Sequence, residues 1–106
     1  MPPRIDQREA SEGNLWVIVA HPLVINCPVL GNPMPEITWY KDGSPVDESI
    51  DRNIRIRSRG QRLEFASVDV TDVGRYECQA RNLAGIASRF YNLSVLGITS
   101  LSLLVL

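Results

Sequence analysis

Residues 72–81 read Asp72-Val73-Gly74-Arg75-Tyr76-Glu77-Cys78-Gln79-Ala80-Arg81. From the arginine onward, polar side chains alternate with apolar or small ones. A period of two is typical of a strand with one buried face. Tyr76, Cys78 and Ala80 share the apolar side. We therefore predict a half-buried β-strand that points a tyrosine and a cysteine into the core.

Segments on either side of this stretch show the same alternation. Turn signals rich in Gly, Pro, Asn and Asp separate them, and many short strands between such turns are typical of an all-β sandwich. Gly74 and several valines leave room for no more than one helical turn near residues 69–76. The side chains predicted to point inward are Leu23, Ile25, Cys27, Ile37, Trp39, Ile54, Ile56, Leu63 and Phe65.

The last predicted strand lacks a uniform alternation. Ile86 and Phe90 fall on one parity, whereas Tyr91, Leu93 and Val95 fall on the other. A β-bulge inserts one extra residue and lets a strand change faces. We therefore predict a bulge near Phe90.

Length and composition predict one domain. The chain has 106 residues, of which 44% are hydrophobic, enough for one core. Its net charge of −1 argues against a nucleic-acid partner and a polybasic membrane anchor. The longest apolar runs, 15–20 and 101–106, are much shorter than the roughly 20 residues of a membrane-spanning helix, so we predict no membrane insertion.

The two cysteines, Cys27 and Cys78, are predicted to face the core from different strands. Two sheets about 10 Å apart can be joined by a disulfide only where both side chains point into the gap. Closing a loop of this length would stabilise the fold by about 4 kcal/mol. Trp39, twelve residues after Cys27, is expected to pack on the bridge, and the Tyr76 hydroxyl is expected to reach the backbone of the preceding corner. The alternative is a buried thiol pair, as an intracellular chain would have.

This combination resembles the immunoglobulin domain of the intermediate set (I-set). The residues that carry the resemblance are Cys27, Trp39, Leu63, Asp72-x-Gly74-x-Tyr76-x-Cys78 and Asn82-x-Ala84-Gly85. The resemblance covers residues 2–96 and implies an immunoglobulin-like Greek-key β-sandwich of two antiparallel sheets. It also implies a core signature of Trp39, Leu63, Asp72, Gly74 and Tyr76. The apolar tail, residues 97–106, is expected to lie outside this fold.

Within the I-set, the sequence is most similar to the tandem immunoglobulin modules of hemicentin. The matching segments are Pro2-Pro3-Arg4-Ile5, Pro22-x-x-x-x-Cys27, Trp39-Tyr40-Lys41-Asp42-Gly43 and Gly74-Arg75-Tyr76. The resemblance implies a secreted matrix or cell-surface protein with many such domains in a row, whose partners are neighbouring modules and other extracellular or cell-surface proteins. An intracellular muscle-type module is the alternative.

The sequence predicts no catalytic or metal site. Its single histidine, His21, precedes Pro22 in a turn, and the two cysteines lack the close spacing of zinc ligands. No nucleophile motif accompanies them. We therefore predict a protein that is not an enzyme and has no cofactor.

One glycosylation motif lies on the last predicted strand. Asn92-Leu93-Ser94 is a sequon, and because Leu93 and Val95 are predicted to point inward, Asn92 is predicted to face solvent. A possible N-glycan at Asn92 favours an extracellular location over an intracellular one.

Ten of the eleven basic residues are arginines, which bind carboxylates and sulfates by bidentate contacts. Arg55, Arg57 and Arg62 are predicted to share an outward face that could bind sulfated glycans or an acidic protein. The alternative is that neighbouring acidic residues neutralise this face: Asp47, Glu48, Asp51 and Glu64. One arginine of the group, Arg52 or Arg55, is also a candidate partner for Asp72.

Exposed aromatic residues form a second candidate binding face on the opposite sheet. Tyr40 is predicted to point outward, and the orientation of Phe90 depends on the bulge; such residues could anchor a neighbouring module or a partner. Met34 is expected at the tip of a loop stiffened by Pro33 and Pro35, where a preceding module would contact it. The sequence therefore predicts a structural and adhesive module that acts through protein contacts, with glycan recognition as the alternative.

Overall fold

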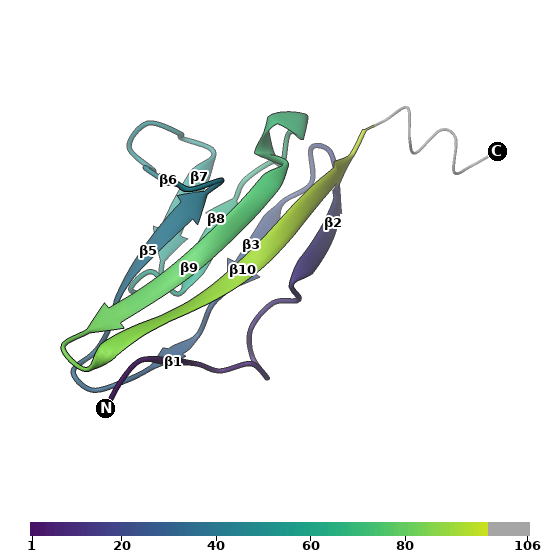
Figure 1. Ribbon diagram of the computed structural model, residues 1–106. Coiled ribbons are helices and arrows are strands. Elements are labelled where there is room, and N and C mark those ends of the chain that lie inside the picture. Colours follow the sequence, from purple (N-terminus) through teal and green to yellow (C-terminus); the bar gives the residue numbers. More distant parts are fainter. Residues whose placement is uncertain (98–106) are drawn as a thin grey trace.

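The computed structural model describes residues 1–97, which form two packed layers of β-strands (Figure 1). The elements are β1 (Arg4–Ile5), β2 (Asn14–Ile18), β3 (Leu23–Asn26), β4 (Val29–Leu30), β5 (Glu36–Lys41), β6 (Ser44–Pro45), β7 (Ile54–Arg57), β8 (Arg62–Phe65), the 3₁₀ helix η1 (Val70–Asp72), β9 (Gly74–Asn82) and β10 (Gly85–Leu96). The all-β sandwich predicted from the sequence is confirmed. Apart from Gly97, the predicted tail of residues 97–106 lies outside the described residues.

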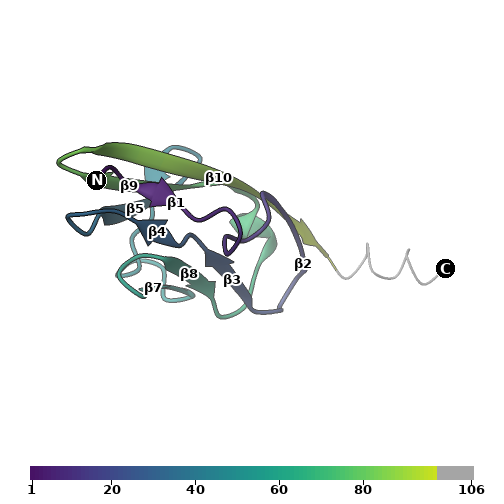
Figure 2. The same ribbon diagram turned by 90° about the horizontal axis from the view of Figure 1, so that it is seen from below.

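The first layer is a five-stranded sheet in the order β2-β10-β9-β5-β6. The second layer holds β3-β8-β7 together with the short pair β1-β4. Figure 2 shows the two layers one above the other. Cys27 and Pro28 separate β3 from β4, and Pro28 has no amide hydrogen for a sheet ladder.

Within residues 1–97, all strand pairs are antiparallel except one. The edge strand β2 runs parallel to β10, with Asn14 opposite Asn92 and Trp16 opposite Ser94. The expectation of antiparallel sheets therefore needs this one exception. Local alternation could not reveal the pairing, because its two strands lie about 78 residues apart in the chain.

The core contains the side chains that the alternation predicted. Leu23, Ile37 and Ile56 are half-buried and pack against it. The other predicted inward residues are buried: Ile25, Cys27, Trp39, Ile54, Leu63, Phe65, Tyr76, Cys78 and Ala80.

The predicted bulge in the last strand is wrong. β10 pairs with β9 residue for residue, from Gly85 opposite Asn82 to Leu93 opposite Gly74. Ile86 and Phe90 are therefore on the outward face, 56% and 42% exposed. The guanidinium of Arg75 lies 3.9 Å from the centre of the Phe90 ring. Because this cation covers the ring in place, the strand does not need to turn Phe90 into the core.

Candidate functional site

A disulfide between Cys27 and Cys78 joins the two layers, with the two Cα atoms 6.6 Å apart. Trp39 is directly opposite Cys78 in the β5-β9 register and is 1% exposed. Its indole Nε1 donates a hydrogen bond to the carbonyl of Gly60 at 2.6 Å. The predicted grouping of cysteine pair and tryptophan is present, and it fixes one sheet against the other.

Beside this group, the corner before β9 is closed by Tyr76. Its buried hydroxyl donates to the carbonyl oxygen of Asp72 at 2.6 Å, as predicted. Burial raises the pKa of Tyr76, and the nearby charge of Asp72 raises it further. The Asp72 carboxylate accepts from the backbone N–H of Asp69 at 2.8 Å and so caps η1.

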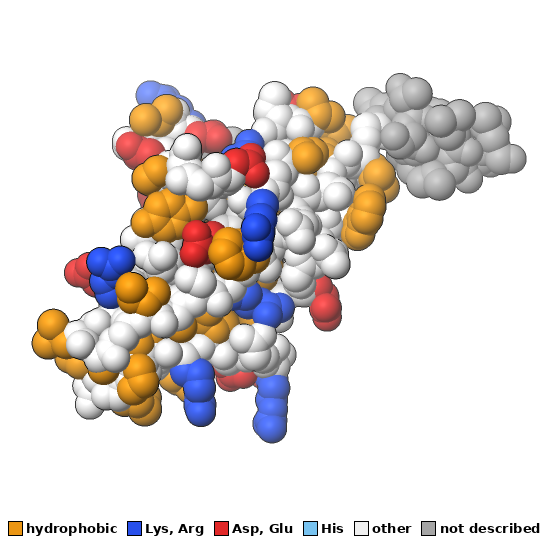
Figure 3. Space-filling model, viewed as in Figure 1, with side chains coloured by type: hydrophobic (Ala, Val, Ile, Leu, Met, Phe, Trp, Pro, Cys, Tyr) orange, Lys and Arg blue, Asp and Glu red, His pale blue; other side chains and the backbone are white. Residues whose placement is uncertain are grey.

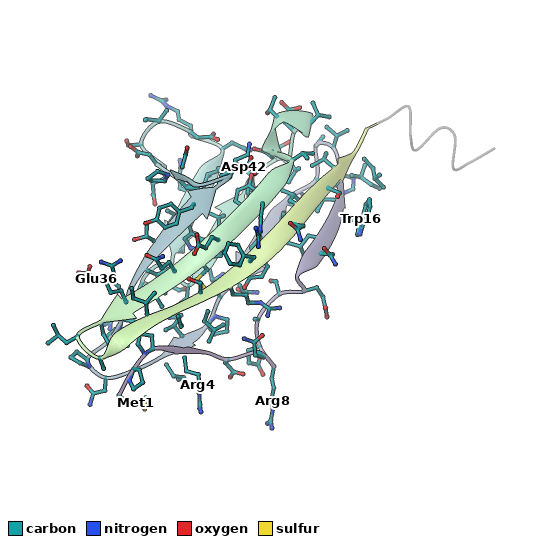
Figure 4. All side chains as sticks on the ribbon, in the orientation of Figure 1. Met1, Arg4, Arg8, Trp16, Glu36 and Asp42 are labelled. Atoms are coloured by element: carbon teal, nitrogen blue, oxygen red, sulfur yellow. A yellow bond between two sulfur atoms is a disulfide. The ribbon has the colours of Figure 1, made fainter. Side chains whose placement is uncertain are left out.

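Gly74 allows a close approach between this corner and the loop after β5. A Cβ at Gly74 would be 2.7 Å from a carboxylate oxygen of Asp42. The other oxygen of that carboxylate accepts from the backbone N–H of Arg75 at 2.9 Å. Figure 4 shows Asp42 beside the start of β9. The glycine in the signature is therefore explained by space and not by backbone conformation.

The arginine face lies on β7 and β8. Arg57 Nε is 3.2 Å from one carboxylate oxygen of Glu64, and Arg62 Nη2 is 3.2 Å from the other. Arg55 instead donates from Nη1 to the carbonyls of Arg52 and Ile54, at 3.0 Å each. The structure thus brings Arg57 and Arg62 together through a shared anion, which offsets part of their charge.

The other predicted acidic partners do not neutralise this face. Asp47, Glu48 and Asp51 each accept from backbone N–H groups, of Ser49, Ile56 and Asn53 respectively. The Ser49 hydroxyl also bonds to Asp47, and these hydrogen bonds lower the pKa of that carboxyl. The predicted pairing of Asp72 with Arg52 or Arg55 is wrong, because the cap of η1 occupies the Asp72 carboxylate.

The aromatic face is the outward side of the five-stranded sheet. Tyr40, Glu77 and Phe90 are in one cross-strand row, with Glu77 between the two rings. Tyr40 is half-buried, and the guanidinium of Arg75 lies over the ring of Phe90. Figure 3, which views this side, shows hydrophobic side chains scattered among charged and polar ones. The arrangement is suited to modest polar contacts more than to a continuous apolar interface.

Asn92 and the unpredicted residue Trp16 are near the edge of the same sheet. Asn92 is exposed, and its side-chain Nδ2 donates to Asn14 Oδ1 at 3.3 Å. Trp16 is 70% exposed and was not singled out from the sequence. The sequence contains no signal for this, because residues 15–18 are all apolar and show no alternation.

Residues 1–97 contain neither a metal-binding cluster nor a membrane-spanning helix. Within that part of the chain, no group of three or more His, Cys, Asp or Glu side chains could hold a metal ion. No helix among the same residues is long and apolar enough to cross a membrane. His21 lies exposed after β2.

Comparisons with known proteins identify the family. The model of the immunoglobulin I-set domain matches residues 8–95. The chain belongs to the immunoglobulin I-set family.

Relatives place this domain among much longer proteins. The chain is 41% identical to hemicentin-1 of Homo sapiens over 96 residues, which is 91% of this chain and 2% of that protein. It is 34% identical to Protein turtle of Drosophila melanogaster, again over 91% of this chain but 6% of the relative. In the crystal structure of the titin M10–obscurin-like 1 Ig complex, a chain 28% identical superposes with a TM-score of 0.78, covering 91% of this chain and 95% of that one. The chain therefore spans only a small part of its curated relatives.

Proposed function

We propose that this domain is a non-catalytic structural and adhesive module of a multidomain extracellular matrix or cell-surface protein, and that it acts through protein–protein contacts. The observation that carries the proposal is the placement of the two ends of the described chain. At one pole, the carbonyl of Met1 accepts from Asn82 at the β9-β10 turn, at 2.8 Å. Gly97 follows the far end of β10.

The strand β10 spans the length of the domain between these poles. It has 12 residues, which correspond to about 35 Å. In Figures 1 and 2 the N-terminus and the end of β10 lie at opposite ends of the sandwich. Modules attached on both sides would therefore be held apart by the full length of the domain, and the Cys27–Cys78 bond would keep its layers together.

Exposed apolar residues at the Met1 pole support a contact with a neighbouring module. Met34, Leu83 and Ile86 are 55%, 96% and 56% exposed, on the loop before β5 and around the β9-β10 turn. Grouped apolar exposure of this kind is typical of a surface that another domain covers. Met34 has the exposure expected for its proposed contact with a preceding module.

The disulfide and the likeness to hemicentin-1 support an extracellular location. The likeness to the titin–obscurin-like 1 structure is compatible with the alternative, an intracellular muscle-type module with reduced thiols. Recognition of sulfated glycans gains no support from the arginine face, since Glu64 already pairs with two of its three arginines.

The test is the intact mass of the domain secreted from eukaryotic cells. The protein is alkylated under denaturing conditions without reductant, and its mass is measured again after reduction. Cysteines that react only after reduction are the expected result, because the disulfide is formed in an oxidising compartment. Two cysteines alkylated without reductant would overturn the extracellular proposal and favour the intracellular module.

A further inference from the structure

Trp16 is an unusual residue for an edge strand. It is 70% exposed, although tryptophan is highly buried on average in folded proteins. Its neighbours Leu15 and Val17 pack against the core, so the β2 alternation directs Trp16 outward. Figure 4 shows its side chain projecting from β2. A large aromatic surface is thus held in a fixed place with little of it covered.

The sequon lies on the strand beside it. Asn92 and Ser94 are opposite Asn14 and Trp16 in the parallel register, and alternation gives all four the same outward face. Ser94 is therefore directly beside Trp16 on the neighbouring strand, and Asn92 is its diagonal neighbour. Diagonal neighbours on paired strands are about 7–8 Å apart, within reach of long side chains.

The Asn92 side chain is also directed toward β2. Its Nδ2 donates to Asn14 Oδ1 at 3.3 Å, and its backbone N–H donates to the carbonyl of Gly13 at 2.7 Å. Nδ2 is the atom to which an N-linked sugar is attached, and a glycosylated amide keeps one hydrogen. That hydrogen can keep the bond to Asn14, so the first sugar would begin next to the strand that bears Trp16.

We propose that Asn92 carries an N-glycan whose first sugars stack on the indole of Trp16. In the transfer, Asn92 Nδ2 forms a bond to the anomeric carbon of an oligosaccharide carried on a lipid diphosphate. The bond from that carbon to the diphosphate breaks, the diphosphate leaves with the electron pair, and Nδ2 loses one proton to solvent. This inference rests on the proposed extracellular function, since the lipid-linked donor is supplied in the secretory pathway.

Stacking of this kind is favourable because the glycan is tethered. The C–H face of a pyranose ring is apolar, and covering the indole with it removes apolar surface from water. A covalent link to Asn92 keeps the sugar at a local concentration of about the millimolar range, so a contact with a dissociation constant in that range is substantially occupied without free ligand. Trp16 is then a platform that holds the glycan across the edge of the sheet.

Tryptophan fluorescence tests the contact directly. The chain has two tryptophans, and Trp39 is 1% exposed, so quenching by acrylamide reports almost entirely on Trp16. The full chain is secreted as wild type, as Ser94→Ala, which removes the sequon, and as Ser94→Thr, which retains it. We expect the quenching constant of the glycosylated wild type and Ser94→Thr to be about two-fold lower than that of Ser94→Ala, because stacking covers one face of the indole.

Thermal unfolding supplies a second measurement. The glycan is expected to raise Tm by about 3 °C in the wild type and by much less in Trp16→Ala. Ile50→Ala, at a residue 81% exposed outside the strands, is the matched control and should keep the full gain. Equal quenching with and without the glycan, or an unchanged gain in Trp16→Ala, overturns the stacking.

The mass measurement separates the two proposals. A disulfide-bonded secreted protein without a glycan at Asn92 overturns this inference and leaves the extracellular module in place. Two thiols alkylated without reductant overturn the proposed function itself.

Discussion

Removing the single hydroxyl of Tyr76 is expected to lower the free energy of unfolding measurably. Tyr76→Phe leaves the shape of the side chain intact but removes the 2.6 Å hydrogen bond to the buried carbonyl of Asp72. An unsatisfied buried acceptor costs about 1–3 kcal/mol, so the free energy of unfolding should fall by that amount. Urea unfolding measures it. Tyr40→Phe, on the outward face, is the matched control and should change stability by less than about 0.5 kcal/mol; equal losses would contradict the role of the corner.

The raised pKa of Tyr76 predicts that the domain loses stability at alkaline pH. Burial raises the pKa of Tyr76 in the folded state, and burial also raises that of Tyr91, where the charge of Arg89 opposes it. Above about pH 10 the unfolded tyrosines lose protons while the folded ones keep them, so the unfolded state binds fewer protons and stability falls as pH rises. Between the unfolded and folded pKa values of Tyr76, the loss approaches about 1.4 kcal/mol per pH unit. Unfolding of the wild type and Tyr76→Phe at pH 9 to 11 should therefore give a smaller slope for the variant, and identical slopes would contradict this.

At the scale of whole elements, the arginine face on β7 and β8 depends on one carboxylate. Glu64→Gln frees Arg57 and Arg62 from their shared partner and should raise the salt concentration at which the domain elutes from heparin. Glu36→Gln changes the net charge equally on the opposite sheet and is the control. If both variants elute together, net charge alone governs retention and the face has no special affinity.

Strand alternation correctly predicted which side chains point inward. The prediction that failed, the bulge near Phe90, assumed that an apolar side chain must be buried. Cys27, Trp39 and Cys78 lie where the period of two places them. Phe90 follows the same period on the outward face, and the predicted bulge was wrong because an arginine on the neighbouring strand covers this apolar ring there. Sequence patterns describe one strand at a time, so they could not reveal this cover.

The candidate sites show the same limit. Asn92 could be placed on the outward face from its own strand. The tryptophan beside it could not be connected with it, because the parallel pairing of β2 with β10 brings together residues 78 positions apart. Likewise, the Asp72 carboxylate accepts from the backbone N–H of Asp69 in the same turn. A search for oppositely charged side chains does not consider such backbone partners.

For the whole molecule, the decisive bond is the disulfide. Cys27 and Cys78 are 51 residues apart, and a crosslink of that span stabilises the folded state by about 4 kcal/mol in the chain-entropy treatment. Replacing both residues with alanine should therefore lower the urea midpoint by about 2 M, for a slope near 2 kcal/mol per molar. Reduced wild type is the control and should match the double variant, since both lack the crosslink.

The stability of the domain without the disulfide also indicates in which compartment, oxidising or reducing, the module can fold. Domains of this size are stable by about 5–15 kcal/mol, so a domain near the lower end of that range would keep only about 1 kcal/mol after about 4 kcal/mol is removed. An intracellular module with reduced thiols would have to be stably folded without the Cys27–Cys78 disulfide. We expect the reduced domain to be substantially unfolded at 37 °C by circular dichroism, which suits a chain that matures in an oxidising compartment. A reduced domain as stable as the oxidised one would instead mean that the buried core around Trp39 holds the layers together without the crosslink, and the intracellular alternative would then be the better explanation of the cysteine pair.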